Sequence, residues 1–443
     1  MKRVKWVPVP VVLLFLLYRL LQYYQNQKRI RYLTEKRNPV ILIPGLGGSR
    51  LYDSGGNLKW CHWHGFLPHF STTWRDELTV RYNDALQVFE ESQLITPYRT
   101  KHWVNGRFRP TADFGGTEGV GNVLSKTMKS SWQFQGVINM CESLGYRAYT
   151  DTCDAPTLFG APYDFRKITS PSHWFDFCKS LKALIEYAST LHGTGAVLLS
   201  HSMGSPLLLT FFVKYLPKVV ACVQTWKKKF VKRWVTVNGA FGGAGKTVRS
   251  FLSGDNNGMG YICDTGCHDW YQPLLENAAG ILWMLPSPLL FTHNVPIVSV
   301  KTEEGYTVLQ LVQLLEKVSP TAALAYKQTV LPLLTLEAPG VPVVSLTSTQ
   351  VGTPLQSHYT SSNFHHTTVT MKDEREYYSQ FTKNVQHMCG DGTVPYLSLM
   401  VPQQWLDTQE EPVTFVRLNQ ENIGHTSILI EQESLKTVMS LIA

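Results

Sequence analysis

The stretch "VLLSHSMGSP", Val197 to Pro206, decides the fold of this chain. An apolar run leads into Ser-His-Ser-Met-Gly, and a second apolar run, "PLLLTFFVKYL", follows at once. The first run predicts a buried strand and the second a helix, so Ser202 would lie at a sharp strand-to-helix turn between small residues. The pattern is a near match to the G-x-S-x-G nucleophile elbow, with Ser200 in place of the first glycine. A serine-rich turn that only caps a helix is the alternative.

The rest of the chain alternates strand patterns with helical patterns. A buried strand is predicted at Val40 to Ile43, and apolar residues at helical spacing mark residues 172–192. Further strands are predicted in "AVLLS", "RWVTVNGAFGG", "VPVVSLTS" and "PVTFVRL". This alternation predicts an α/β fold around a mostly parallel sheet. Two stretches of irregular pattern, about 52–114 and about 256–340, are expected to be insertions into that fold.

A serine hydroxyl is a weak nucleophile that needs an adjacent base and an orienting carboxylate. In folds with a nucleophile elbow these groups follow in the chain order serine, acid, histidine. "CGDGTVPYLSL" offers Asp391 on a tight turn, and "NIGHTSIL" offers His425 after the last predicted strand, 34 residues later. Singly, Asp391 suits an ordinary Asp-Gly turn and His425 a helix cap or the surface. Their joint position predicts a triad with Ser202.

A nucleophilic serine also requires backbone donors for the oxyanion that forms on its substrate. We expect these to be the amide of Met203, directly after the nucleophile, and the amide of Leu46 in "PGLGG", the loop after the first strand. The glycines beside Leu46 let the backbone approach a substrate carbonyl. Such a mechanism requires no metal ion and no organic cofactor. The eight cysteines contain no C-x-x-C pair of the kind that binds zinc.

A competing motif lies in "AFGGAGKT", Ala240 to Thr247, which nearly spells the phosphate-binding G-x-x-x-x-G-K-[ST] loop. Ala240 replaces its leading glycine, and no apolar strand that ends in a magnesium-binding aspartate stands out afterwards. A nucleotide-binding protein would also leave Ser202, Asp391 and His425 unexplained. The motif is therefore kept only as an unfavoured alternative.

Composition and charge narrow the class of protein. Hydrophobic residues make up 44% and charged residues 17% of the 443 residues, which allows a sizeable core and excludes wholesale disorder. The formal net charge of +8 is a mild excess that suits an anionic membrane surface better than a nucleic-acid groove. The basic run "KKKFVKR", Lys227 to Arg233, between Trp226 and Trp234, is interpreted as a solvated face or as a contribution to membrane binding.

The chain begins with a basic and then apolar segment. "MKRVK" precedes "WVPVPVVLLFLLY", and further basic residues follow up to Arg37 without a small-residue cleavage site. Residues 1–37 are therefore predicted to form an uncleaved membrane anchor or a membrane-surface helix, with a cleaved signal peptide as the alternative. We expect a membrane-associated protein, on an endomembrane, whose catalytic domain occupies residues 38–443. The side of the membrane does not follow from the flanking charges.

Five separated blocks resemble the lecithin:cholesterol acyltransferase family, which has lysosomal phospholipase and phospholipid:diacylglycerol acyltransferase among its relatives. The blocks are "PVILIPGLGGSRL", "GAPYDFR", "SHSMG", "WKKKFVKRWVTVNGAFGGAGKTVRSFLSGDNN" and "GDGTVP" with the later "GH". Together they extend from about residue 39 to the C-terminus. The fourth block is the most specific, because Gly-Gly, Lys-Thr and "SGDN" recur in that order in the family.

The resemblance implies an α/β-hydrolase core with a cap, a membrane-binding subdomain and a mobile lid. It assigns the triad and the oxyanion donors to the residues already singled out: Ser202, Asp391, His425, Leu46 and Met203. The lid would begin at "LKWCHWHGFLPHF". There Trp60, Trp63 and Phe66 are expected to contact lipid, with buried aromatic packing as the alternative.

The function that the resemblance implies is serine-dependent lipid acyl transfer. A phospholipid acyl ester would be cleaved through an acyl-serine, and the acyl group would pass to a lipid alcohol, such as a sterol or diacylglycerol, or to water. The expected partners are a phospholipid membrane surface and a lipid acyl acceptor, with no nucleic acid, and no protein partner is inferred. A catalytically inactive lipid-binding relative is the alternative.

Overall fold

The structure is a computed structural model. It describes residues 37–60, 71–123, 133–254, 268–301, 303–364, 369–421 and 423–443, with the single residues 19, 22 and 129. The expectations for Trp63, Phe66 and most of the N-terminal segment 1–37 lie outside these residues. Within the described ranges, no helix combines the length and the apolar character that a membrane crossing requires.

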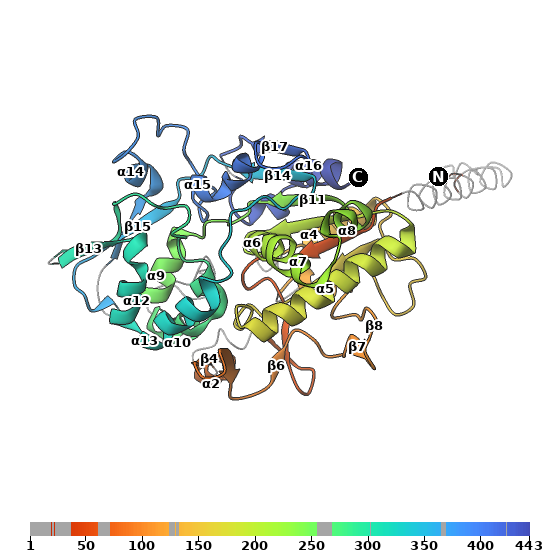
Figure 1. Ribbon diagram of the computed structural model, residues 1–443, viewed down its shortest axis with the longest axis horizontal. Coiled ribbons are helices and arrows are strands. Elements are labelled where there is room, and N and C mark those ends of the chain that lie inside the picture. The colour runs from red at the N-terminus through yellow and green to blue at the C-terminus, as the bar shows by residue number, and fades with distance from the viewer. Residues whose placement is uncertain are drawn as a thin grey trace, which may run out of the picture.

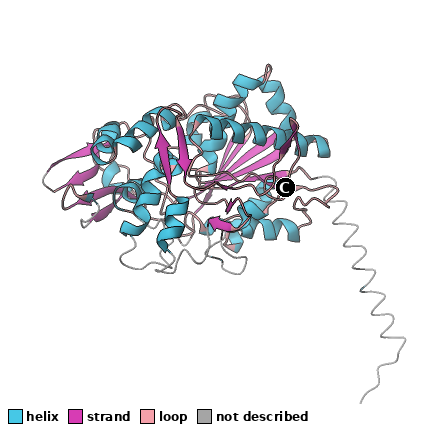
Figure 2. Cartoon of the chain, turned by 90° about the horizontal axis from the view of Figure 1, so that it is seen from below, coloured by secondary structure: helices cyan, strands magenta, loops and turns pink. Residues whose placement is uncertain are grey.

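A central sheet of six strands, all paired in parallel, forms the middle layer of the molecule (Figures 1 and 2). The α/β fold with a mostly parallel sheet, predicted from the sequence, is therefore confirmed. β1 pairs with β9 on one side and with β10 on the other, so the strand order reverses at β1. From one edge to the other the strands are β17 (Val413–Leu418), β14 (Val343–Ser348), β11 (Val231–Val237), β10 (Ala196–His201), β1 (Val40–Ile43) and β9 (Leu158–Gly160).

The core strands are apolar because both faces of the sheet are covered. Every residue of β1 and of β10 is buried. Successive side chains of a strand point to opposite faces, and β1 shows this directly. Ile41 and Ile43 belong to one hydrophobic cluster, whereas Val40 and Leu42 belong to another. A run of consecutive apolar residues is therefore the sequence pattern that this sheet requires.

The helices form a layer on each face of the sheet (Figure 1). One hydrophobic cluster joins the sheet to α4 (Gln135–Ser143) and α16 (Gln432–Ile442). The other joins it to α5 (Pro171–His192), η3 (Phe211–Tyr215) and α8 (Val223–Phe230). The helix predicted over 172–192 is α5, whose apolar stripe packs into this second cluster. The remaining helices near the sheet are α3 (Glu118–Gly121), α6 (Gly204–Thr210), α7 (Leu216–Val219), α15 (Tyr396–Leu399), η7 (Val401–Trp405) and η8 (Ser427–Leu429). A further helix, α14 (Glu374–Tyr378), lies beside the second sheet described next.

A second, four-stranded sheet with its own helices lies beside the central sheet, at the left of Figure 1. Its strands are β13 (Glu303–Thr307), β12 (Pro296–Val300), β15 (Pro354–Tyr359) and β16 (Val369–Asp373). The helices of this region are α9 (Gly245–Ser253), α10 (His268–Asn277), α11 (Ala279–Trp283), η4 (Val308–Gln310), α12 (Leu311–Val318), α13 (Pro320–Ala325) and η5 (Tyr326–Val330). β15 and β16 follow core strand β14, so this sheet also draws on chain beyond residue 340.

In its described residues, 44–60 and 71–117, the segment between β1 and α3 contains one helix and short antiparallel strands. Its contact with the core includes a buried ion cluster, in which Arg166 bonds Asp164 and Glu91 at 2.7 and 2.9 Å and Lys167 bonds Glu91 at 2.7 Å. Arg166 is fully buried, so its role is structural. The elements of the segment are β2 (Leu51–Asp53), β3 (Leu58–Trp60), α2 (Ser71–Leu78), β4 (Val80–Asn83), β5 (Val88–Glu91), β6 (Ile95–Thr96), β7 (Trp103–Val104) and β8 (Arg107–Phe108).

Candidate active site

The turn at Ser202 has the backbone geometry of a nucleophile elbow. β10 ends at His201 and α6 begins at Gly204, so two residues reverse the chain direction. Ser202 has φ +53°, in the left-handed region that non-glycine residues rarely adopt. A Cβ at Gly204 would lie 2.5 Å from the carbonyl oxygen of Pro44, so only glycine fits there. The close approach of strand, turn and helix explains why the sequence has small residues around Ser202.

Ser200, which departs from the G-x-S-x-G pattern, has a structural use of its own. Its hydroxyl accepts a hydrogen bond from the indole N–H of Trp234 at 2.7 Å. It also bonds the Ser205 hydroxyl at 2.8 Å, which in turn bonds the Thr236 hydroxyl at 2.8 Å. These four side chains are buried, so each hydroxyl satisfies a polar group that burial would otherwise leave unpaired.

The structure brings the three predicted triad residues together. The Oγ of Ser202 lies 2.8 Å from Nε2 of His425, and Nδ1 of His425 lies 2.7 Å from Oδ2 of Asp391. Ser202 is 8% exposed and Asp391 1% exposed, and the side chain of His425 between them is 11% exposed, so all three groups are largely shielded from solvent. The imidazole therefore lies between a hydroxyl that it can deprotonate and a carboxylate that orients it.

Backbone hydrogen bonds hold Asp391 in this orientation. Its Oδ1 accepts the N–H groups of Thr393 and Val394 at 2.9 and 2.7 Å, which leaves Oδ2 for His425. The backbone N–H of His425 donates to the carbonyl of Asp391 at 2.9 Å. Val351, directly after β14, forms a bridge to Asp391. The acid loop is thus fixed to the carboxyl end of the sheet.

A second, buried carboxylate supports the same loop. Glu374 of α14 accepts the backbone N–H groups of Gly390 and Tyr396 and the hydroxyl of Tyr378. These contacts fasten both ends of the loop that carries Asp391. Burial raises the pKa of Glu374 to about 8 although all three bonds act in the opposite direction. Nothing in the sequence indicated this residue, because Glu374 follows the second sheet rather than the motif.

His201, the residue before Ser202, contacts His425 directly. Its Nε2 bonds the backbone carbonyl of His425 at 2.9 Å, and the two ring centroids are 4.8 Å apart. Burial and the neighbouring His425 lower the pKa of His201 to about 3, so the ring is neutral. Its single proton must then lie on Nε2, because a carbonyl only accepts. The only sequence signal for this role was its place inside "SHSMG".

The expected oxyanion donors lie on both sides of Ser202. Met203 is the N-cap residue of α6, so its backbone N–H has no partner within the helix. The loop of Leu46 passes close to the serine, since a Cβ at Gly45 would lie 2.8 Å from the Cβ of Ser202. Thus the two predicted donors belong to segments that meet at Ser202.

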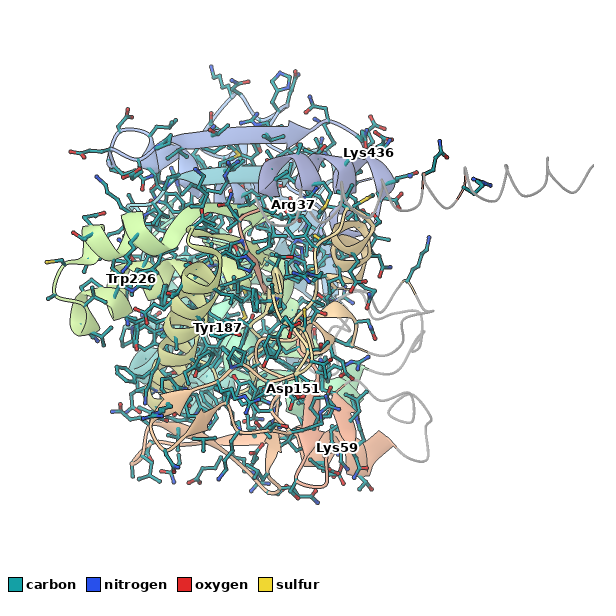
Figure 3. All side chains as sticks on the ribbon, turned by 90° about the vertical axis from the view of Figure 1, so that its right-hand side faces the viewer. Arg37, Lys59, Asp151, Tyr187, Trp226 and Lys436 are labelled. Atoms are coloured by element: carbon teal, nitrogen blue, oxygen red, sulfur yellow. The ribbon has the colours of Figure 1, made fainter. Side chains whose placement is uncertain are left out.

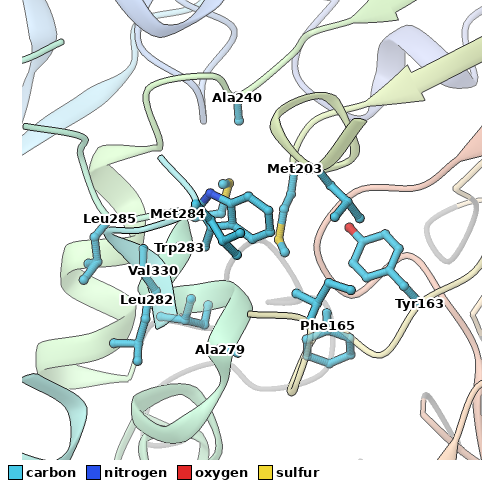
Figure 4. Close-up of a cluster of buried hydrophobic side chains, with 14 of the residues drawn as sticks. Tyr163, Phe165, Met203, Ala240, Ala279, Leu282, Trp283, Met284, Leu285 and Val330 are labelled. Atoms are coloured by element: carbon cyan, nitrogen blue, oxygen red, sulfur yellow. The ribbon is translucent and has the colours of Figure 1, made fainter. Parts of the chain in front are cut away.

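Apolar side chains cover this part of the site. Leu46 and Met203 both reach α11, where a Cβ on Gly280 would lie 2.6 Å from Leu46 Cδ1 and 3.2 Å from Met203 Sδ. Figure 4 shows the Met203 side chain pointing into a buried cluster with Phe165 and Trp283. Such surroundings exclude water and strengthen the electrostatic effect of any donor beside Ser202.

Trp60 corrects one expectation. It is 6% exposed, stacks on Trp74 at 5.9 Å and packs against Phe165 at 5.1 Å, so the prediction that it contacts lipid is wrong for this structure. Its indole N–H donates to the carbonyl of Gly47 at 2.8 Å. Gly47 has φ +68° and follows Leu46, so Trp60 supports the loop that carries an expected oxyanion donor.

The glycine-rich segment Ala240–Thr247 does not form a phosphate cradle. The N–H of Gly242 donates to the hydroxyl of Ser398 at 2.8 Å, and that of Ala244 to the carbonyl of Met284 at 2.8 Å. In a phosphate-binding loop these amides would point at the ligand. A Cβ at Gly245 would lie 2.5 Å from Leu355 Cα, so this glycine allows close packing of α9 on β15 instead. The nucleotide-binding alternative is therefore wrong.

A parallel sheet of this strand order, with a serine in a positive-φ turn after β10 and a histidine after the last strand, is an α/β-hydrolase fold. The family model of lecithin:cholesterol acyltransferase matches residues 57–332, more than half of the chain. The chain therefore belongs to the lecithin:cholesterol acyltransferase family.

Individual relatives are similar along nearly their whole length. Lecithin-cholesterol acyltransferase-like 1 of Arabidopsis thaliana is 25% identical, over 91% of this chain and 89% of the relative. Lysosomal phospholipase A and acyltransferase of Rattus norvegicus is 26% identical, over 87% of this chain and 86% of the relative. Phosphatidylcholine-sterol acyltransferase of Mus musculus is 23% identical, over 93% of this chain and 86% of the relative.

Proposed function

We propose that this protein transfers acyl groups between lipids with Ser202 as its nucleophile. It would cleave an acyl ester of a phospholipid, retain the acyl group on Ser202, and pass it to a lipid alcohol or to water. The observation that carries the proposal is the continuous line from Ser202 Oγ to His425 Nε2 at 2.8 Å and from His425 Nδ1 to Asp391 Oδ2 at 2.7 Å. Membership of the lecithin:cholesterol acyltransferase family supports a lipid ester as the substrate.

In the first half of the reaction, Nε2 of His425 accepts the hydroxyl proton while Oγ of Ser202 attacks the ester carbonyl carbon. The carbonyl oxygen becomes an oxyanion, to which the amides of Leu46 and Met203 donate. When the intermediate collapses, His425 returns the proton to the leaving oxygen of the lysophospholipid. Asp391 stays ionised and stabilises the imidazolium that forms between these steps.

In the second half, an acceptor hydroxyl replaces the lysophospholipid. His425 takes its proton, the acceptor oxygen attacks the acyl carbonyl, and the proton then returns to Ser202. A lipid alcohol as acceptor gives a new ester, and water gives a fatty acid. The names of the relatives include both acyltransferase and phospholipase, which supports a site that serves either acceptor.

The test uses the full-length protein with vesicles of acyl-labelled phosphatidylcholine that contain diacylglycerol or a sterol. Label in a neutral ester indicates an acyltransferase, and label in free fatty acid alone indicates a phospholipase. Ser202→Ala should abolish both products. Ser200→Ala is the matched control, because its hydroxyl bonds Trp234 rather than His425. Lipid binding without any serine-dependent product would instead identify an inactive lipid-binding relative.

We further propose that the protein works at a membrane surface, with residues 1–37 as its anchor. The support is the apolar sequence "WVPVPVVLLFLLY" between basic residues, together with a substrate class that resides in membranes. Fractionation of cells that express the full chain or residues 38–443 tests this. If both forms partition equally into the membrane pellet, residues 1–37 are not the anchor.

A further inference from the structure

A cleft of about 520 Å³ lies at the end of the central sheet opposite to Ser202. It is lined by the residues that precede or begin β10, β11, β14 and β17, and by α8. Because these strands are parallel, the cleft marks their amino ends, whereas Ser202 follows the carboxyl end of β10. The six residues of β10 separate the two places by about 20 Å. We call this feature the amino-edge cleft.

The charged lining of the amino-edge cleft is predominantly basic. Lys227 and Lys228 come from α8, Lys232 from β11, and Glu411 from the loop before β17. Glu411 lies 3.9 Å from the ammonium group of Lys228 and can neutralise that one charge. Two positive charges thus remain without a matching carboxylate in the lining.

Lys227 is the unusual member of this lining. It is only 6% exposed, yet no carboxylate in the described part of the chain forms an ion pair with it. Its nearest aromatic neighbour is Phe212, with the ammonium 5.8 Å from the ring centroid. Burial lowers the pKa of Lys227 to about 8. A buried ammonium group is costly unless a partner compensates its charge, and the described residues supply no carboxylate that does so.

The backbone of Gly340 approaches this ammonium group closely. A Cβ at Gly340 would lie 3.2 Å from Nζ of Lys227 and 2.9 Å from Nε2 of Gln224. Gly340 also has φ +63°, so a glycine suits both its backbone conformation and this close approach. Trp226 and Trp234, which flank the basic run interpreted as a solvated face or as a contribution to membrane binding, are buried in the core. Figure 3 labels Trp226 beside the green helices at the left of that view.

We propose that the amino-edge cleft binds a phosphate group, with the ammonium of Lys227 as its buried anchor and Lys228 and Lys232 at its rim. A phosphate monoester carries nearly two negative charges at neutral pH, which matches the uncompensated charge of the lining. Lysine binds phosphate as a point charge and so needs no fixed fork geometry. The distance from Ser202 means that the bound phosphate does not take part in acyl transfer. It regulates or docks the enzyme instead.

The phosphate could belong to a soluble ester or to a lipid headgroup, and the experiment separates the two. Full-length protein is titrated with glycerol 3-phosphate and, separately, with vesicles of phosphatidylcholine with or without phosphatidic acid. A soluble site gives thermal stabilisation by glycerol 3-phosphate. A headgroup site gives binding only to the vesicles that contain phosphatidic acid. Either result supports the proposal.

Lys227→Met tests the anchor, because methionine has a similar length and suits a buried position. We expect phosphate affinity to fall roughly tenfold or more, the usual effect of losing a buried charged hydrogen bond. Lys229→Met is the matched control, since Lys229 lies exposed on the same helix and does not line the cleft. A second variant, Lys232→Met, keeps the buried anchor and should weaken binding less.

Two outcomes would overturn the proposal. One is that neither glycerol 3-phosphate nor phosphatidic acid binds the wild-type protein. The other is that Lys227→Met and Lys229→Met reduce binding equally, which would mean that only overall surface charge matters. Serine-dependent acyl release by Lys227→Met, measured on phosphatidylcholine vesicles without glycerol 3-phosphate or phosphatidic acid, should equal that of the wild type. Phosphate binding can therefore be absent while the proposed acyl transfer is observed. Equally, acyl transfer can be absent while phosphate binding is observed.

Discussion

His201 and His425 lie with their ring centroids 4.8 Å apart, and Nε2 of His201 donates to the backbone carbonyl of His425 at 2.9 Å. The residue before the proposed nucleophile thus fixes the backbone of the proposed base. We interpret His201 as a positioning residue, because its hydrogen bond reaches Ser202 only through His425. Asn238 adds a weaker contact of 3.4 Å to the same carbonyl.

Replacing His201 by phenylalanine keeps a ring in place but removes the donor to His425. We expect kcat to fall roughly fivefold with little change in KM, because the lost bond is worth about 1 kcal/mol and its loss misplaces the base only slightly. Glutamine can direct a side-chain N–H to the same carbonyl, so His201→Gln should recover part of the loss. If His201 had only a structural role, both variants would have a lower melting temperature, but their kcat values would not differ from each other.

The lowered pKa of His201 also predicts how stability depends on pH. The unfolded imidazole has a pKa near 6.5, whereas the folded one has a pKa of about 3. Between these values the unfolded state binds more protons, so the free energy of unfolding falls as the pH falls, by at most about 1.4 kcal/mol per pH unit. In His201→Gln this contribution disappears. Urea unfolding at pH 7 and pH 4 should show that the free energy of unfolding decreases less in the variant than in the wild type. Equal decreases in the two proteins would contradict the prediction.

Replacing Glu374 by alanine removes the acceptor for the N–H groups of Gly390 and Tyr396 and frees the loop of Asp391. We expect roughly a tenfold or larger loss of kcat, since a misoriented acid no longer holds His425. The matched control is Glu376→Ala, an exposed position on the same helix, which should keep wild-type kcat. Unchanged kcat in Glu374→Ala would show that the Asp391 loop keeps its geometry without the hydrogen bonds to Glu374.

The raised pKa of Glu374 predicts a change of stability at neutral pH. Its folded pKa of about 8 exceeds the ordinary value of 4.5, so the folded state binds more protons between these limits. The free energy of unfolding therefore falls as the pH rises from about 4.5 to about 8. Glu374→Gln cannot ionise and should lack this part of the dependence. To check this, the urea midpoints of the wild type and of the variant are measured at pH 5 and at pH 8. The change of midpoint between the two pH values is then compared between the two proteins.

Replacing Ser200 by glycine restores the usual elbow motif but leaves the indole N–H of Trp234 without its acceptor. We expect the protein to lose about 1–3 kcal/mol of unfolding free energy, the cost of an unsatisfied buried polar group. The reactivity of Ser202 toward a fluorophosphonate probe should persist, because no bond of the triad involves Ser200. A variant as stable as the wild type would mean that water or another group satisfies Trp234.

The local patterns of the sequence predicted most of the core. The apolar runs of β1 and β10 and the apolar stripe of α5 depend on residues within one element, so they are visible without the structure. The meeting of Ser202, Asp391 and His425 was predictable because serine, acid and histidine follow one another in a known chain order in folds with a nucleophile elbow. The parallel sheet then brings the strand ends to one edge.

The contacts that support the site were not predictable, because they join residues far apart in the chain. Glu374 reaches the Asp391 loop from the end of the second sheet. Lys227 and Trp226 looked like an exposed basic and aromatic surface, whereas the packing of α8 on the sheet buries both. An isolated tryptophan or lysine carries no periodic signal that would separate these outcomes.

Trp60 gives the sharpest test of the oxyanion loop. Trp60→Phe keeps an aromatic ring against Trp74 and Phe165 but removes the N–H that donates to the carbonyl of Gly47. The loop that carries the Leu46 amide then loses one of its fixed points. We expect kcat to fall by roughly tenfold and KM to change little, since the oxyanion exists only during the reaction and direct loss of a donor costs about a hundredfold or more.

The control for Trp60→Phe is Trp103→Phe, which likewise removes an indole N–H, here one that donates to Ser180 at 2.9 Å away from the loop. Both variants lose one hydrogen bond, so both should lose a similar amount of stability, about 1 kcal/mol. Only Trp60→Phe should slow the formation of the acyl-serine in single-turnover assays. If the two variants acylate at the same rate, the hydrogen bond to Gly47 serves folding alone, and the Leu46 amide does not depend on it.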